Sequence, residues 1–157
     1  MNRLVLPLGV FVAFGLAACG GSDQTFTLSA GTYALTTEEA SPDECKLVSM
    51  PTPITITVVG STVTVTDVGG EPSGTLQGND ASLASVQNFD SNTGASPPFN
   101  CVEKITKTIA ISLTANDTFS GTQQYRSELD IGNACTEQNL GYTLPCESTV
   151  KFKAVKQ

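Results

Sequence analysis

Apolar and polar residues alternate along much of this 157-residue chain, and helical spacing is rare. Residues 54–68 read ITITVVGSTVTVTDV, with an apolar residue at nearly every second position on both sides of Gly60-Ser61. Alternation of this kind is typical of a strand with one buried face. A two-residue turn that begins with glycine suits the twist of an antiparallel pair. The stretch therefore predicts a β-hairpin.

A longer hairpin is expected over residues 105–131, with its turn at Asn116-Asp117. The apolar face of its first strand consists of Ile105, Ile109, Ile111 and Leu113. One face of the return strand carries Phe119, Gly121, Gln123, Tyr125, Leu129 and Ile131. We expect both faces to point into the same core.

Four further strands bring the expected total to eight. They are placed at residues 31–37, 73–78, 82–89 and 148–155. A turn at Asn79-Asp80 joins the second of these to the third, and residues 38–48 can hold one helical turn. The fold expected is all-β, an antiparallel up-and-down meander that closes into a barrel because closure removes exposed edges; a flattened β-sandwich is the alternative. The expected core contains Ile56, Val58, Val63, Val65, Ile109, Ile111, Leu113, Phe119 and Phe152.

The chain begins with Arg3 and an apolar run over residues 4–18, which is too short for a membrane-spanning helix and typical of a signal peptide. Leu16-Ala17-Ala18-Cys19 resembles the lipobox of bacterial lipoproteins. The resemblance implies cleavage before Cys19, acylation of its thiol with chains such as palmitate, and a membrane lipid as partner. Gly20 after the cysteine implies the outer membrane. A retained anchor helix and an ordinary cleaved signal are the alternatives.

The expected organisation is a signal peptide over 1–18, a lipidated flexible tether over 19–25 and one domain over 26–157. The formal net charge of −7 becomes one unit more negative once Arg3 is removed. That acidity excludes a basic nucleic-acid footprint. The lysines are expected on solvated strand faces; they are Lys104, Lys107, Lys151, Lys153 and Lys156.

Four cysteines remain beyond Cys19, and an even number in an exported chain predicts two disulfides. They are Cys45, Cys101, Cys135 and Cys146, and they form no CxxC pair, which excludes a zinc ribbon. Distance alone allows all three connectivities. Counting outward from the Asn116-Asp117 turn brings Cys101 opposite Gly132, close to Cys135. This register favours Cys101 with Cys135 and Cys45 with Cys146 over the rival pairs Cys135–Cys146 and Cys45–Cys101.

The chain contains no histidine, so Ser-His-Asp and Cys-His nucleophiles and imidazole metal ligands are excluded. The acidic cluster Glu38, Glu39, Asp43 and Glu44 is expected to face water. Residues 90–94 begin like a calcium loop, but Cys101 stands where a bidentate glutamate is needed. No phosphate-binding motif occurs. We therefore expect no catalytic residues, no metal and no cofactor.

Gly31-Thr32-Tyr33 on the first strand, the meander and a cysteine before the last strand resemble the calycin-like barrels, of which lipocalins are the best known. Lipocalins carry Gly-x-Trp where this chain has Gly-x-Tyr. A small barrel of eight strands either fills with side chains or holds one small ligand. Tyr125 and Gln123 are the candidates for polar contacts in an apolar pocket.

Two functions fit these expectations. In the first, the protein is an envelope-anchored binding or interaction module for a small apolar ligand, a glycan or another envelope protein. In the second, it is a structural or assembly-assisting lipoprotein with a filled barrel. An apolar cavity would favour the first, and a filled interior the second.

Overall fold

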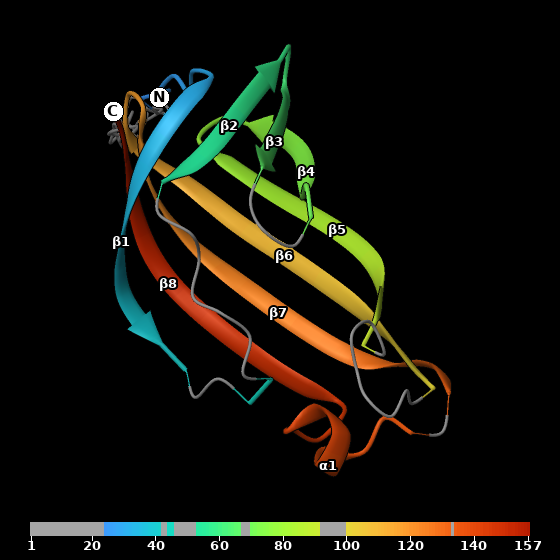
Figure 1. The fold of residues 1–157 in the computed structure, drawn as a ribbon. Coiled ribbons are helices and arrows are strands. Elements are labelled where there is room, and N and C mark those ends of the chain that lie inside the picture. Colours follow the sequence, from blue (N-terminus) through green and yellow to red (C-terminus); the bar gives the residue numbers. More distant parts are fainter. Residues whose placement is uncertain (1–23, 42–43, 46–52, 67–69, 92–99, 133) are drawn as a thin grey trace, which may run out of the picture.

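Eight antiparallel strands follow one another around a single closed ring in the computed structural model of this chain (Figure 1). The structure describes residues 24–41, 44–45, 53–66, 70–91, 100–132 and 134–157. The predicted signal peptide over residues 1–18 and Cys19 lie outside the described residues. The strands are β1 (Gly31–Ala40), β2 (Ile54–Val59), β3 (Thr62–Thr66), β4 (Ser73–Gln77), β5 (Asp80–Asp90), β6 (Cys101–Ala115), β7 (Thr118–Gly132) and β8 (Cys146–Lys156).

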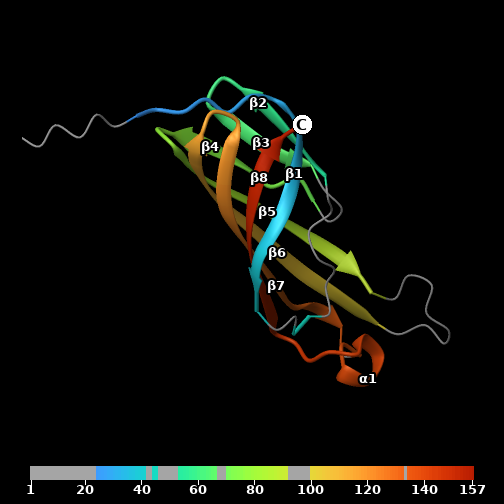
Figure 2. The same ribbon diagram turned by 90° about the vertical axis from the view of Figure 1, so that its left-hand side faces the viewer.

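The meander closes because β1 pairs with β8 as well as with β2. This arrangement confirms the predicted all-β fold, and the closed ring is observed instead of the flattened sandwich. Below the short strands β2, β3 and β4, the strands β5 to β8 and β1 run on toward the single helix described, α1 (Glu137–Leu140) (Figures 1 and 2). Residues 38–40, expected in a helical turn, belong to β1.

Two of the three predicted tight turns are confirmed, and the third is displaced by one residue. Val59 pairs with Thr62, and Ala115 pairs with Thr118 across Asn116-Asp117. Gln77 pairs with Asp80, so the turn between β4 and β5 is Gly78-Asn79 and not Asn79-Asp80. Gly78 has φ +59°, a left-handed conformation that glycine adopts without a steric penalty.

Two bulges keep β6 and β7 in phase. The register shifts between Leu113 and Ala115 on β6, and again between Val102 and Glu103, opposite Asp130 of β7. Because the extra residues lie on opposite strands, the shifts cancel. Cys101 therefore pairs with Gly132, as predicted from the turn.

Between the two bulges, the inward-facing residues of β6 pair with the inward-facing residues of β7. Beyond the second bulge this match is lost. Ile109 pairs with Gln123, and both are buried. Ile131 pairs with Val102 beyond the second bulge and is 60% exposed, while Leu129 is 51% exposed. The expectation that Ile131 continues the inner face of β7 is therefore wrong, whereas Leu129, which pairs with the buried Glu103, lies on that face at its exposed end.

The apolar core fills the part of the ring that all eight strands enclose. Of the nine residues expected there, eight are buried and Val58 is partly buried against them. The ring of Phe119 lies 5.5 Å from that of Tyr33 and 6.1 Å from that of Phe152, centroid to centroid. A Cβ on Gly121 would approach Phe152 to 2.5 Å, so only glycine leaves room for this ring.

The segment Gln24–Ser29, here called the capping segment, closes this end of the ring. Asn79 accepts from the Phe26 amide at 2.7 Å and donates to the Gln24 carbonyl at 2.7 Å. Asn116 accepts from the Thr27 amide at 2.9 Å. Leu28 is buried in the core. Polar side chains of two turns thus hold the capping segment in place. Its apolar residues Phe26 and Leu28 close this end of the barrel by packing on the core.

Asp117 joins the capping segment, β1 and β8. Its carboxylate accepts from the Ser29 amide at 2.6 Å, the Ser29 hydroxyl at 3.1 Å and the Tyr33 hydroxyl at 3.1 Å. Burial acts to raise the pKa of this carboxyl group, but the bonds from Ser29 and Tyr33 and the charge of Lys156 together lower it. The ionised form therefore stabilises the folded state.

In the described part of the chain, no helix has the length and apolar character needed to cross a bilayer.

We expect Phe119→Ala to lower the free energy of unfolding by about 3–5 kcal/mol, because it leaves a cavity between two other rings. Val155→Ala, at a position that is 52% exposed, is the matched control and should change stability by less than about 0.5 kcal/mol. Denaturant unfolding measures both. A similar, small loss in the two variants would show that the aromatic cluster does not support the core.

We expect Asp117→Asn to lower the free energy of unfolding at pH 7 by about 1–3 kcal/mol, the range for hydrogen bonds to a charged group. Because the folded pKa of Asp117 is depressed, its contribution is present above about pH 4 and is lost as the pH falls through the folded pKa. The variant should therefore lose less stability on acidification than the original protein. Asn116→Ala removes a bond that does not titrate and should cost the same at pH 7 and pH 3. Equal acid sensitivity of the original protein and Asp117→Asn would refute this role.

Candidate functional site

The interior of the barrel is divided into an apolar half and a polar half. The inward positions of β6 are, from its turn end, Leu113, Ile111, Ile109, Lys107, Ile105, Glu103 and Cys101. Lys107 is 2% exposed and Glu103 is 1% exposed. The expectation that Lys107 lies on a solvated strand face is therefore wrong, because the alternation of β6 points its side chain inward.

One row of polar side chains crosses four strands at the level of Lys107. Strand register places Ser85 of β5 opposite Lys107, Lys107 opposite Tyr125 of β7, and Tyr125 opposite Ser148 of β8. We call these four residues the polar row. The next row toward the core is mostly apolar and contains Leu83, Ile109, Gln123 and Val150. Gln123 thus lies at the boundary between the two halves.

The polar row lies where the ring of paired strands opens. The pairing of β4 with β5 ends at Ala84, one residue before Ser85. On the other side, β2 pairs with β1 only as far as Tyr33. Figure 1 shows the longer strands continuing beyond both points. We call this end of the barrel the polar mouth.

Gly70 lies against one end of the polar row. A Cβ at this position would come within 3.1 Å of the Ser85 hydroxyl and 3.6 Å of Oε1 of Gln87. Gly70 has φ +121°, which side-chain-bearing residues rarely adopt. Glycine therefore allows the backbone to approach the row closely.

Two buried polar atoms at the mouth have no hydrogen-bond partner in the structure described: Oγ of Ser85 and Oε1 of Gln123. Gln123 is 7% exposed. Buried polar groups in proteins almost always have a partner, which is protein, ordered water or ligand. Ser85 lies on β5 and Gln123 on β7, in adjacent rows with β6 between them.

Glu103 organises the outer end of the mouth. Its carboxylate accepts hydrogen bonds from Ser127 at 2.5 Å, from Tyr142 at 2.8 Å and from Ser91. Three hydroxyl groups from different segments thus converge on one buried charge. Such a saturated network stabilises a single arrangement of the strand ends.

The Tyr142 phenol reports on this network. Burial raises its pKa above the ordinary value, and the hydrogen bond and negative charge of Glu103 raise it further, with a smaller contribution from Tyr125. Tyr142 therefore stays neutral and keeps donating to Glu103 over the physiological range.

Two disulfides fasten the strands at the mouth. Cys101 is bonded to Cys135 with 5.0 Å between their Cα atoms, and Cys45 is bonded to Cys146 with 5.2 Å between theirs. These are the pairs that the register of the Asn116-Asp117 turn favours. Cys146 pairs with Ser127, so this crosslink lies beside the Glu103 network.

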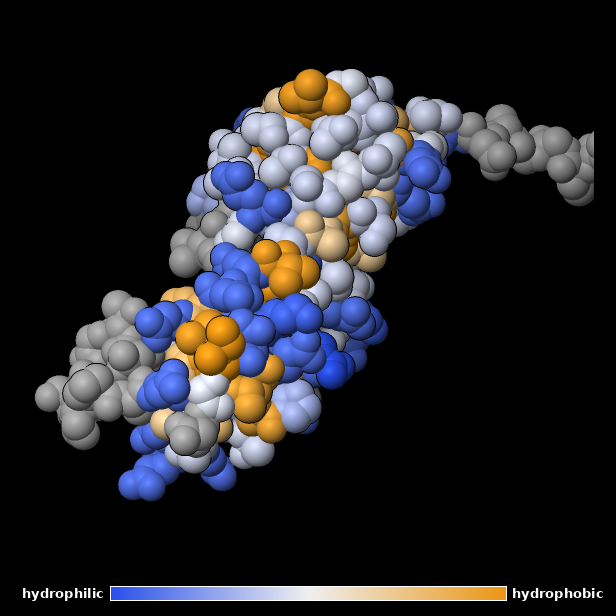
Figure 3. Space-filling view, turned by 90° about the vertical axis from the view of Figure 1, so that its right-hand side faces the viewer, coloured by the Kyte–Doolittle hydropathy of each residue, from blue (hydrophilic) through white to orange (hydrophobic). Residues whose placement is uncertain are grey.

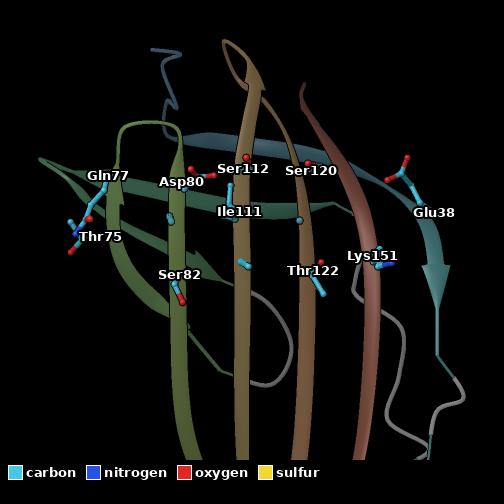
Figure 4. Close-up of a pocket in the computed structure, with 13 residues that line it drawn as sticks. Glu38, Thr75, Gln77, Asp80, Ser82, Ile111, Ser112, Ser120, Thr122 and Lys151 are labelled. Atoms are coloured by element: carbon cyan, nitrogen blue, oxygen red, sulfur yellow. The ribbon is translucent and has the colours of Figure 1, made fainter. Parts of the chain in front are cut away.

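A hollow of about 940 Å³ lies on the outer face of β4 to β8 (Figure 4). Its floor consists of small residues, among them Ser82, Ser112, Ser120 and Thr122, with Lys151 and Glu38 at one end. The buried unpartnered atoms of the described chain belong to Ser85 and Gln123, which do not line this hollow. The outer hollow is therefore the weaker candidate for a ligand site.

The acidic cluster expected to face water is placed only in part. Glu38 pairs with Lys153 at 2.5 Å and Glu39 with Lys151 at 2.7 Å on the barrel surface. Glu44 is exposed, and Asp43 lies outside the described residues. Of the segment 90–94, residues 92–94 also lie outside, and Ser91 donates to Glu103.

Exposed apolar side chains lie on β5 and β7 near the mouth. Phe89 and Leu129 pair with Glu103 from either side and are 53% and 51% exposed. Val86 and Ile131 are each 60% exposed on the same strands. Figure 3 shows apolar side chains lying among hydrophilic ones over the lower part of this face. The rim thus combines apolar contact surface with charge.

The polar groups of the mouth are engaged mainly by one another. Within the ranges that the structure describes, no group of three or more His, Cys, Asp or Glu residues is placed to hold a metal ion. The carboxylate of Glu103 is engaged by three hydroxyl groups. Lys107 and Tyr125 also interact with neighbours.

The predicted site residues Tyr125 and Gln123 both lie on the inner faces of the barrel, Gln123 buried and Tyr125 half-buried. The neighbours of Tyr125 in the polar row carry ammonium and hydroxyl groups, whereas Gln123 lies between the apolar residues Ile109 and Val150. Lys107 and Glu103 were missed although both share the odd-numbered face of Ile105 and Ile109, a signal that parity along β6 contains. No pattern in the sequence pointed to Ser85 or Tyr142.

No family model, curated protein or solved structure matches this chain.

We expect Glu103→Gln to lower the free energy of unfolding by about 1.5–3 kcal/mol, because three buried hydroxyl donors lose a charged acceptor. The pKa of Tyr142 should fall toward its ordinary value, since the negative charge that raises it is gone. Denaturant unfolding and ultraviolet titration of tyrosinate measure the two effects.

Glu128→Gln is the matched control for this substitution. Glu128 pairs with Lys104 at 3.1 Å on the surface, and such pairs contribute at most about 1 kcal/mol. A tyrosinate titration that is the same in Glu103→Gln as in the original protein would contradict the network.

Proposed function

We propose that this protein is an envelope-anchored bacterial lipoprotein that acts as a non-enzymatic binding module, with the polar mouth of its barrel as the binding site. The observation that carries the proposal is the pair of buried, unpartnered polar atoms on Ser85 and Gln123. They lie beside a buried lysine in a barrel whose other half is filled with apolar side chains. A polar interior of this kind is a cost to stability that ligand binding explains.

Attachment to the membrane is proposed through Cys19. The motif Leu16-Ala17-Ala18-Cys19, the signal peptide over 1–18 and the tether over 19–25 support lipidation. Each buried CH₂ of an acyl chain contributes about 0.8 kcal/mol, so two or three chains hold a protein firmly in a bilayer. Gly20 supports the outer membrane as the destination.

The capping segment supports a definite orientation for the proposed module. It enters the barrel at the end where Asn79, Asn116 and Asp117 hold it, which is the end opposite the mouth. A lipid anchor before Gln24 would therefore hold the closed end toward the membrane. The mouth would then face away from the bilayer, toward its ligand.

The three ligand classes suggested by the sequence are not equally supported. A wholly apolar ligand would leave Ser85 and Gln123 without partners. A glycan has hydroxyl groups for them. An envelope protein could use the exposed rim formed by Val86, Phe89, Leu129 and Ile131. The resemblance to calycin-like barrels supports ligand binding at a barrel mouth and remains part of the proposal.

A structural or assembly-assisting role is the second candidate. The observation that favours it is the saturated Glu103 network beside two disulfides, which holds the mouth in one arrangement without any ligand. In that case ordered water would satisfy Ser85 and Gln123.

We expect Cys19→Ala to abolish acylation and to leave an uncleaved or mis-sorted precursor, because the lipobox cysteine carries the first acyl chains. Intact mass spectrometry of the membrane fraction measures this. Recovery of the normal mature mass from the variant would refute the lipid anchor.

We expect native mass spectrometry of the detergent-extracted mature protein to show an additional bound mass that denaturation releases. The measurement separates the two candidate functions, because a structural barrel would carry no such mass. The control is mature protein that has been denatured and refolded without envelope extract. The Cys19→Ala precursor is not a suitable control, because it differs in location.

A further inference from the structure

We propose that Val59, at the tip of the β2–β3 hairpin, inserts into the headgroup region of the membrane that holds Cys19. The inference rests on the lipid anchor of the proposed function. It adds a second contact between the protein and the bilayer, made by the folded barrel itself.

The tip of the β2–β3 hairpin exposes a large apolar side chain. Val59 is the last residue of β2 and pairs with Thr62 across the turn Gly60-Ser61. Its side chain is 77% exposed, more than any other large apolar side chain in the described part of the chain. A Cβ on Gly60 would meet no atom within 4 Å, so the turn projects into open space. Figure 1 shows the hairpin tip standing clear at the top of the molecule, where Figure 3 shows apolar surface.

Hydrogen bonds place this tip beside the point where the tether would join the barrel. The Leu76 amide donates to the Ser61 carbonyl at 2.8 Å, which joins the hairpin turn to the end of β4. The turn that follows β4 contains Asn79, which donates to the Gln24 carbonyl at 2.7 Å. The five peptide links between Cys19 and Gln24 span at most about 18 Å. An acylated Cys19 would therefore keep the hairpin tip close to the bilayer surface.

The distribution of charge at this end of the barrel favours an apolar contact with lipid. Residues 54–66, which contain the hairpin, include no charged side chain, although charged residues make up 15% of the chain. Lys156 lies 3.8 Å from Asp117, and Asp80 is exposed. None of the three turns at this end contains a lysine or arginine, so anionic lipid has no basic cluster to bind there. The contact should therefore form on neutral membranes.

One valine does not hold a soluble protein on a membrane, but an anchored protein is a different case. Acyl chains on Cys19 would supply the affinity, and the contact of the hairpin with lipid would then be intramolecular. The small gain from burying Val59 is enough to bias the tilt of a barrel that is already tethered. The contact would direct the hairpin toward the bilayer and the polar mouth away from it.

A single tryptophan tests the contact, because the chain contains none of its own. Val59→Trp places an indole at the hairpin tip, and Val86→Trp, at a position that is 60% exposed near the mouth, is the matched control. Each mature lipoprotein is reconstituted into phosphatidylcholine vesicles with and without bromine atoms on the acyl chains, which quench nearby indole. We expect brominated lipid to remove about half or more of the Val59→Trp emission and little of the Val86→Trp emission.

Tryptophan itself favours the membrane interface, so a second reporter is placed beside Val59. Thr62→Trp puts the indole opposite Val59 across the turn. We expect quenching of Thr62→Trp by brominated lipid to fall at least about twofold when Val59→Asp is added, because a carboxylate resists transfer out of water. Val86→Asp is the matched control for that substitution and should leave the quenching of Thr62→Trp unchanged.

Quenching of Val59→Trp and Thr62→Trp that is absent in Val86→Trp, and that Val59→Asp weakens, supports the proposal. Equal quenching at both ends, no quenching at the tip, or quenching of Thr62→Trp that Val59→Asp leaves unchanged overturns it. Blue-shifted but unquenched emission, with dimers in native mass spectrometry, also overturns it, because a second copy then covers the tip.

The intact mass of the same samples separates this contact from the lipid anchor. If the acyl chains are present and the tip is not quenched, the anchor stands and only the hairpin contact is wrong. If the acyl chains are absent, the anchor and the hairpin contact fail together.

Discussion

Pairing of the first strand with the last is the constraint on which the rest of the structure depends. β1 is bonded to β2 only over Gly31–Tyr33, whereas it follows β8 from Tyr33 to Ala40. The Gln157 amide continues this seam to Thr32 at 2.9 Å, and the Ser41 amide continues it to Thr149 at 2.8 Å. Without the pairing of β1 with β8, Tyr33 and Phe152 would be exposed to solvent. The capping segment would also lose the core against which it packs. Because β1 pairs with β8 over more residues than with β2, the barrel is closed at one end and open at the other.

The contrast between the two ends explains why the interior changes character halfway along the strands. Where eight strands surround the axis, the interior is filled with apolar side chains, glycine and the hydrogen-bonded Tyr33. Where the ring opens, the same inward positions carry Lys107, Tyr125 and Glu103, whose burial is compensated by networks that cross several strands. The closed half therefore supplies most of the hydrophobic stabilisation, and the open half tolerates polar groups that lower stability. Ser85 and Gln123 lie at the junction, where the protein offers them no partner.

The alternation of residues was enough to predict the strands, because a strand with one buried face has a period of two that neighbouring structure rarely hides. Gly60-Ser61 and Asn116-Asp117 were readable as turns for the same local reason. The bulges at Thr114 and Asp130 were not readable, since they depend on the hydrogen bonds of the partner strand. The polar mouth was not predicted, for a different reason. The inner face of β6 was assigned from its apolar residues alone, although Lys107 and Glu103 occupy the same odd-numbered positions as Ile105 and Ile109. Contacts such as Tyr142 with Glu103 join segments far apart in the chain, so only the folded structure brings them together.

The capping segment also determines how the barrel responds to mechanical force. Any tension on the chain that precedes Gln24 reaches the bonds from Asn79 to Gln24 and Phe26 first. It then passes to Asn116 and Asp117, which lie in the turn between the two longest strands, β6 and β7. The segment can thus peel away bond by bond while the seam between β1 and β8 stays intact, and the disulfides at the far end keep the strand ends together. A pull on the chain before Gln24 would therefore detach the capping segment before it disturbed the strands of the mouth.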